Sequence, residues 1–137
     1  MPARTPHKMR VIFVTAGSED QAVAIARALV GERLAACVNI VGPVRSIYRW
    51  GDSVEDDREY LLIIKTRALL YMKVETRVRE LHTYEVPEVL ALNADRGSPP
   101  YIQWMLDSTG PIRTASNKRP PKRAPGRSRN NIASKSE

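Results

Sequence analysis

The chain has 137 residues, of which 42% are hydrophobic, and a formal net charge of +7. This length fits one domain, and no apolar run approaches the roughly 18 residues that cross a bilayer. Cys37 is the only cysteine, so an internal disulfide is excluded and a reducing, cytoplasmic compartment is favoured. The apolar run 11–14 falls short of the roughly 7 residues of a secretion signal core. We therefore expect a cytoplasmic protein that does not enter membranes.

The positive charge lies in the C-terminal segment 111–137, which carries eight Lys or Arg residues against one Glu. Large apolar side chains are almost absent from it, so it cannot bury enough surface to offset the entropy of ordering. We expect a flexible N-terminus over 1–8, a folded domain over 9–110 and a disordered basic tail over 111–137. The tail lacks the aromatic side chains that stack on bases, so only non-specific attraction to nucleic acid is expected.

The first predicted elements are a strand and a helix. The run 10–16, RVIFVTA, is β-branched and apolar, which indicates a strand. Ser18 and Gln21 have the spacing of a capping box, which predicts the start of a helix. Apolar residues then recur at three- and four-residue spacing and form one stripe: Ala22, Ile25, Ala26, Leu29 and Val30.

A long hairpin is predicted next. Its arms are 35–50 and 54–67, joined by a turn at 51–53. Gly42 and Pro43 interrupt the first arm, and proline cannot donate to a ladder, so this arm has an edge or bulge there. Arms of about 14 residues extend roughly 45 Å at about 3.3 Å per residue. Such arms project beyond a domain of this size.

The remaining elements are a helix over 69–82, a strand over 88–95 and a short helix over 99–107 that begins with proline. The resulting order is βαββαβ with a terminal helix. This order is that of a ferredoxin-like α+β sandwich, in which two helices cover one face of a four-stranded antiparallel sheet.

The second face of that sheet predicts an oligomer. In 60–66 both alternating faces carry apolar residues, whereas the helices of one chain cover a single face. Another subunit is the simplest cover for the second face and for the projecting hairpin. The alternative is that the terminal helix, with Tyr101 and Trp104, covers it.

Five short motifs occur in one order along the chain: AACVN, SIYRW, REYLLIIKT, HTYEVPEV and YIQW. Over roughly residues 9–107 they resemble CutA, the divalent-cation tolerance family. The resemblance implies a tight homotrimer built around the hairpins, a cytoplasmic location and a link to copper and other divalent metals. The implied architecture is also similar to that of the PII signalling proteins, trimers with ligand clefts between subunits.

The resemblance places the recurrent residues of the family at definite positions of this sequence. They are Cys37, Asn39, Tyr48, Trp50, Glu59, Lys65, His82, Tyr84, Glu85, Pro87, Glu88, Tyr101 and Trp104. Three positions depart from the common pattern: Leu81 where some members have a second histidine, Thr83 where many have proline, and Gly51 directly after the tryptophan.

A metal site is one hypothesis for these residues. Cys37 and His82 supply thiolate and imidazole, which suit copper or zinc, and Glu85 or groups of another subunit would complete the ligand set. The structural alternative is that Cys37 is a small buried hydrophobe and that His82 lies in the last helical turn, near the negative end of the dipole.

A ligand cleft between subunits is the second hypothesis. We expect Tyr48, Trp50, Glu59, Lys65, Tyr84 and Glu88 to line it. The structural alternatives are that Lys65 pairs with a carboxylate such as Glu85 or Glu88, and that the two hairpin aromatics anchor an interface.

No nucleophile, phosphate-binding or zinc-protease motif is present, so a non-enzymatic function is predicted. The first hypothesis is a trimeric CutA-like protein that binds copper or another divalent ion, with no organic cofactor. The alternative is a PII-like regulator that binds a small anion and a protein partner.

Overall fold

The computed structural model describes residues 8–112, so the expectations for the N-terminal segment 1–7 and for nearly all of the basic tail lie outside the described residues. The elements in chain order are β1 (Met9–Ala16), α1 (Glu19–Gly31), β2 (Cys37–Trp50), β3 (Ser53–Arg67), α2 (Tyr71–Leu81), β4 (Leu90–Asn93) and α3 (Pro99–Asp107). A short 3-10 turn, Ala68–Leu70, precedes α2. Within the described range no helix has the length and apolarity needed to cross a membrane.

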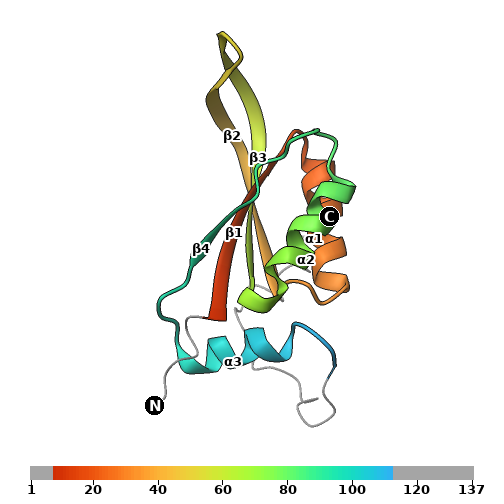
Figure 1. Ribbon diagram of the computed structural model, residues 1–137, viewed down its shortest axis with the longest axis vertical. Coiled ribbons are helices and arrows are strands. Elements are labelled where there is room, and N and C mark those ends of the chain that lie inside the picture. The colour runs from red at the N-terminus through yellow and green to blue at the C-terminus, as the bar shows by residue number, and fades with distance from the viewer. Residues whose placement is uncertain (1–7, 113–137) are drawn as a thin grey trace, which may run out of the picture.

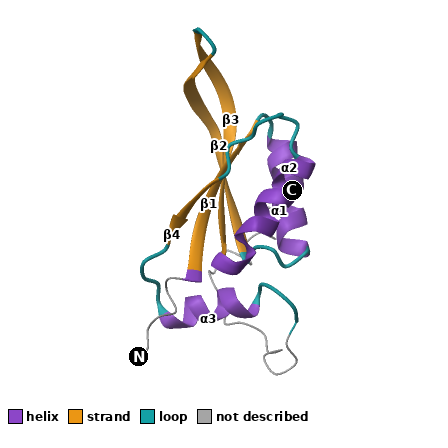
Figure 2. Cartoon of the chain, viewed as in Figure 1, coloured by secondary structure: helices purple, strands orange, loops and turns teal. Residues whose placement is uncertain are grey.

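The described strands form one antiparallel sheet in the order β2-β3-β1-β4. Helices α1 and α2 lie side by side on one face of it, and α3 lies at one end (Figure 1, Figure 2). The α+β class and the order of elements expected from the sequence are therefore confirmed.

The core lies between the sheet and the helices α1 and α2. Alternate residues of the two inner strands are fully buried there, among them Ile12, Val14, Leu62 and Ile64, because successive side chains of a strand point to opposite faces. The helices contribute the apolar stripes that their spacing predicts: Ala22, Ile25, Leu29, Val74 and Val78. Ser18 caps α1 as predicted, since the Gln21 backbone N–H donates to Ser18 Oγ at 3.1 Å. The Gln21 side chain does not complete the capping box and bonds Leu81 and Thr83 at the end of α2 instead.

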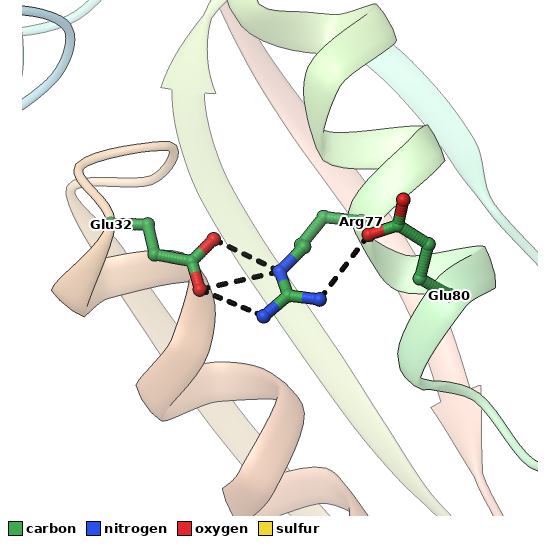
Figure 3. Close-up of polar contacts among 3 residues, drawn as sticks. All are labelled: Glu32, Arg77 and Glu80. Carbon is green, nitrogen blue, oxygen red and sulfur yellow. Dashed lines mark hydrogen bonds and ion pairs between the residues drawn. The ribbon is translucent and has the colours of Figure 1, made fainter.

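An arginine of α2 links the two helices on their outer side. The Arg77 guanidinium donates to both carboxylate oxygens of Glu32, just after α1, at 2.9 Å, and to Glu80 one turn further along α2 at 3.2 Å (Figure 3). The hydrogen bond from Arg77 lowers the pKa of Glu32 below its ordinary value. The planar guanidinium suits such two-point contacts, and it fixes the end of α1 against α2.

The hairpin of β2 and β3 projects well beyond the rest of the chain (Figure 1). Its arms have 14 and 15 residues, as expected. The pairing register shifts between Val41 and Val44, where Gly42 and Pro43 predicted an irregularity. A Cβ at Gly42 would overlap the ring of Tyr60, so the absence of a side chain lets the bulge pack on this ring.

The sheet face opposite α1 and α2 stays largely open within one chain. It carries partly exposed apolar residues of β1 and β3 and two more exposed leucines of β4, Leu90 at 56% and Leu92 at 47%. Helix α3 packs on one end of the sheet around Met9 and Ala36. The terminal helix therefore covers an end of this face and leaves its centre without a cover.

Two expected boundaries were wrong at the α2–β4 junction. The strand predicted over 88–95 is limited to Leu90–Asn93, because β4 pairs only with Arg10–Phe13 of β1. The helix predicted over 69–82 begins at Tyr71, and His82 has left it with φ −78° and ψ 145°. His82 is thus not in the last helical turn, as the structural alternative assumed.

Candidate functional site

His82 joins three parts of the chain directly after α2. Its Nε2 lies 2.7 Å from the carbonyl oxygen of Thr15 at the end of β1, and its Nδ1 accepts the backbone N–H of Tyr84 at 3.0 Å. A carbonyl only accepts, so Nε2 carries the proton and Nδ1 is bare. The ring is buried and lies 4.6 Å, centroid to centroid, from the Tyr84 ring. The imidazole therefore fixes where the segment after α2 crosses the end of β1.

Tyr84 extends this connection to the hairpin. Its hydroxyl donates to Glu59 Oε2 on β3 at 2.7 Å, and Glu59 is 7% exposed. The ring packs close to Gly17, where a Cβ would lie 3.1 Å from the Tyr84 oxygen. A carboxylate buried to this extent needs a hydrogen-bond donor, and Tyr84 supplies one from the junction.

A pocket of about 910 Å³ lies between the hairpin and this junction. On the hairpin side, Tyr48 lies opposite Glu55 in the β2–β3 register, so these two side chains share a face of the hairpin. The junction side comes from the segment 84–88. The lining residues are Thr15, Ser46, Ile47, Tyr48, Arg49, Trp50, Glu55, Glu59, Tyr84, Glu85, Val86 and Glu88.

The pocket has a negative electrostatic character. The hydrogen bond to Asp57, together with loss of water and nearby carboxylates, raises the pKa of Tyr48 to about 12. Desolvation and then the Glu59 carboxylate raise the pKa of Tyr84. Desolvation and the charge of Glu59 raise the pKa of Glu88 as well. In each case the surroundings oppose a further negative charge.

Six of the nine sequence-predicted site residues line this one pocket: Tyr48, Trp50, Glu59, Tyr84, Glu85 and Glu88. His82 lies behind them, in contact with Tyr84. Sequence reasoning did not include Ser46 and Glu55 among the site residues. Ser46 is two positions from Tyr48 and Glu55 is four from Glu59, so strand alternation places each pair on one face and could have predicted both.

The other two predicted residues lie elsewhere. Cys37 and Lys65 are opposite each other in the β2–β3 register. The Lys65 ammonium contacts Asn39 Oδ1, and the Cys37 thiol lies 3.8 Å from the same atom. Within this chain the expected carboxylate partner of Lys65 is thus replaced by an amide.

The ligand set Cys37, His82 and Glu85 does not come together within one chain. Cys37 pairs with Lys65 across the sheet, and Lys65 pairs with Val11 of β1. His82 instead bonds Thr15 of β1. Val11 and Thr15 are four residues apart, which is about 13 Å along a strand. No group of three His, Cys, Asp or Glu side chains in residues 8–112 could hold a metal ion. One chain alone therefore does not supply this metal site.

An antiparallel sheet covered on one face by two helices, with a projecting hairpin and a pocket along it, defines a class of small α+β proteins. A sequence model of the CutA1 divalent ion tolerance protein family matches residues 10–108. The chain belongs to this family.

Named relatives agree with the assignment. The divalent-cation tolerance protein CutA of Thermus thermophilus is 48% identical over 100 residues, which are 73% of this chain and 97% of that protein. Human protein CutA is 44% identical over 104 residues, which are 76% of this chain and 58% of the human protein. This chain thus matches little more than half the length of that relative.

Solved structures of the family share the fold. CutA1 of Oryza sativa has a TM-score of 0.75 at 40% identity and covers 77% of this chain and 97% of its own. The Thermus thermophilus protein has a TM-score of 0.73 at 47% identity, with 74% and 99% covered.

The contact between Tyr84 and Glu59 yields a first prediction. Tyr84→Phe removes the hydroxyl that reaches the buried Glu59 carboxylate, so the free energy of unfolding should fall by about 1 kcal/mol. Tyr48→Phe is the matched control, because it also deletes a phenol–carboxylate bond, to Asp57 at 2.6 Å, but on the exposed hairpin. Urea unfolding measures both, and equal midpoints for the two variants would contradict the prediction.

The raised pKa of Glu88 yields a second prediction. A carboxyl whose folded-state pKa lies above its ordinary 4.5 opposes folding once it is ionised, and this cost is absent when the group is protonated in both states. Glu88→Gln should therefore raise the free energy of unfolding at pH 7 and leave it unchanged at pH 3.5. Urea titrations at both pH values measure it, and an equal effect at both would overturn it.

Proposed function

We propose that this chain is a homotrimeric, ferredoxin-like divalent-cation tolerance protein that binds divalent metal ions, copper among them. The observation that carries the proposal is family membership over residues 10–108, together with the pocket that gathers most of the predicted site residues. The name of the Thermus thermophilus relative describes tolerance to divalent cations and names no reaction, and a non-enzymatic function remains a prediction.

The open sheet face supports the trimer. Leu90 and Leu92 are about half exposed on β4, beside the partly exposed apolar residues of β1 and β3. A continuous apolar surface of this kind is typical of an interface, and the projecting hairpin offers strand edges that a closed oligomer would pair or cover.

The metal proposal depends on that assembly. A zinc or copper site generally needs three or four protein ligands, and the described part of one chain supplies no such group. Cys37 lies on the sheet face opposite the helices, and Glu85 lies exposed at the pocket. Both can therefore contribute to a site that a neighbouring subunit completes.

The comparisons give no support to a PII-like regulator, and the pocket lining disfavours the small anion proposed for it. Four glutamates line the pocket against one arginine, Arg49, and an anion would have to enter against this charge. The location also remains a prediction, because relatives are named as periplasmic in Archaeoglobus fulgidus and chloroplastic in Arabidopsis thaliana.

The test combines mass and metal affinity. Light scattering at micromolar concentration should give three times the 15.4 kDa of the chain. Calorimetric titration with Cu(II) and Zn(II) should show saturable binding to the trimer. Cys37→Ser and Glu85→Gln should each weaken it at least about tenfold, whereas both ring nitrogens of His82 are already engaged by Thr15 and Tyr84.

Glu80→Gln is the matched control for Glu85→Gln, since Glu80 pairs with Arg77 and does not line the pocket. A monomer near 15.4 kDa would overturn the trimer. Unchanged affinity in both the Cys37 and the Glu85 variants would remove these residues from the metal site, and absence of saturable binding would overturn metal binding itself.

A further inference from the structure

The positive charge of the chain lies beyond the domain that it shares with its family. The family model ends at residue 108. The basic tail 111–137 carries eight of the 22 Lys and Arg residues but only one of the 15 Asp and Glu residues. Residues 1–110 keep fourteen of each and have no net charge. The excess charge therefore belongs to a segment that the shared domain does not explain.

The folded domain offers the tail no net attraction. Its own arginines already meet its own carboxylates, because Arg45 pairs with Asp56 at 2.8 Å and Arg77 pairs with Glu32 at 2.9 Å. A neutral body exerts little long-range force on a strongly basic segment. The partner that would balance the charge of the tail is thus expected outside this chain.

Two arginines fix the point at which the tail leaves the fold. Arg33 donates to the carbonyl oxygens of Gly110 at 2.6 Å and Asp107 at 2.7 Å, and its own carbonyl accepts the Gly110 N–H at 2.9 Å. Arg67 donates to the Thr109 hydroxyl and carbonyl, both at 2.9 Å. The basic tail begins at the next residue, beside α3 and at the end of the molecule away from the hairpin tip (Figure 1).

A neighbouring subunit would not cover the tail. Lys and Arg side chains are almost never fully buried unless they are paired, and the tail holds a single carboxylate for eight cations. Burying it between subunits would leave most of these charges without a partner, at a cost of several kcal/mol for each ion. The cations therefore stay available to an outside partner in a trimer, which would carry three such segments.

The side chains of the tail suit phosphate groups. Five of the eight cations are arginines, whose planar guanidinium matches phosphate with two hydrogen bonds. Hydroxyl and amide groups, which also bind phosphate and sugar in nucleic acids, lie between them: Ser116, Asn117, Ser128, Asn130 and Asn131.

The tail lacks the groups that other polyanions require. From 113 to 131 it has no aromatic and no large apolar side chain. Aromatic rings stack on the bases of single strands, and apolar side chains anchor basic segments in a lipid interface. Phosphates on the outside of a duplex need neither, so the composition favours double-stranded nucleic acid over a single strand or a membrane.

We propose that the basic tail binds double-stranded nucleic acid through its phosphates, without sequence preference, and so attaches the folded domain to the duplex. Three tails on one trimer would act together and raise the overall affinity. This activity goes beyond metal binding and does not rest on it, because it uses none of the residues proposed as metal ligands.

The experiment is fluorescence anisotropy of the full chain with labelled DNA duplexes of about 20 base pairs and two unrelated sequences. Binding is expected at 50 mM salt, with affinities for the two sequences within about twofold. The logarithm of the affinity should fall with the logarithm of the salt concentration with a slope of about −4 or steeper, since each phosphate contact contributes about −0.9. Replacing Arg119, Lys122 and Arg123 by glutamine should weaken binding at least about tenfold at 50 mM salt and make the slope shallower by about 2 to 3.

The matched control removes the same charges from the folded domain. Arg27 of α1 and Lys73 and Arg79 of α2 are exposed, and they are likewise two arginines and one lysine. Their replacement by glutamine should leave affinity and slope within about twofold of the wild type. An equal loss in both triple variants would reduce the effect to the net charge of the protein and overturn the proposal. Light scattering checks that each variant keeps the wild-type mass.

Three other outcomes decide the identity of the partner. Absence of duplex binding at 50 mM salt would overturn the proposal, as would a preference of tenfold or more for one of the two sequences. Tighter binding to vesicles of phosphatidylserine and phosphatidylcholine than to the duplex would assign the tail to a membrane surface instead. Duplex binding that depends on the three tail residues would support the proposal even if no metal bound.

Discussion

The arrangement of the site depends on one buried imidazole. His82 stands where α2 ends, and its two nitrogens hold the end of β1 and the backbone of Tyr84. The segment from α2 to β4 has to pass over the end of β1 (Figure 1), and Pro87 prevents it from continuing as a helix. Two side chains position this segment: the His82 ring at its start, and the Gln21 carboxamide of α1, whose oxygen accepts from the Thr83 backbone N–H and hydroxyl. This position brings the Tyr84 hydroxyl within hydrogen-bond distance of Glu59.

The segment 84–88 that His82 helps to hold forms one wall of the pocket. The opposite wall is the hairpin, whose length and bulge come from the pattern of β2 and β3. One face of the sheet forms the core with α1 and α2. The other face leaves apolar and acidic side chains accessible within one chain. The pocket therefore lies at the boundary between the open face and the hairpin.

The sequence allowed the elements to be predicted because each depends on nearby residues: the Ser18 cap, the stripe of α1 and the irregularity at Gly42 and Pro43. The resemblance to CutA identified residues that matter but not which of them meet. Cys37 and His82 lie about four strand positions apart, and Lys65 contacts Asn39. These facts depend on strand register and on where the α2–β4 segment crosses, which arise from long-range contacts that local patterns do not encode.

The most direct test is which nitrogen of the His82 ring carries the proton, read from ¹⁵N NMR of the imidazole at pH 7.5. Because Nδ1 accepts from the Tyr84 backbone N–H while Nε2 faces the Thr15 carbonyl, the account predicts a single tautomer with the proton on Nε2. Tyr84 should also show a slowly exchanging amide. A proton on Nδ1, or an average of the two tautomers, would mean that His82 does not hold the junction, and the pocket would lose its stated origin.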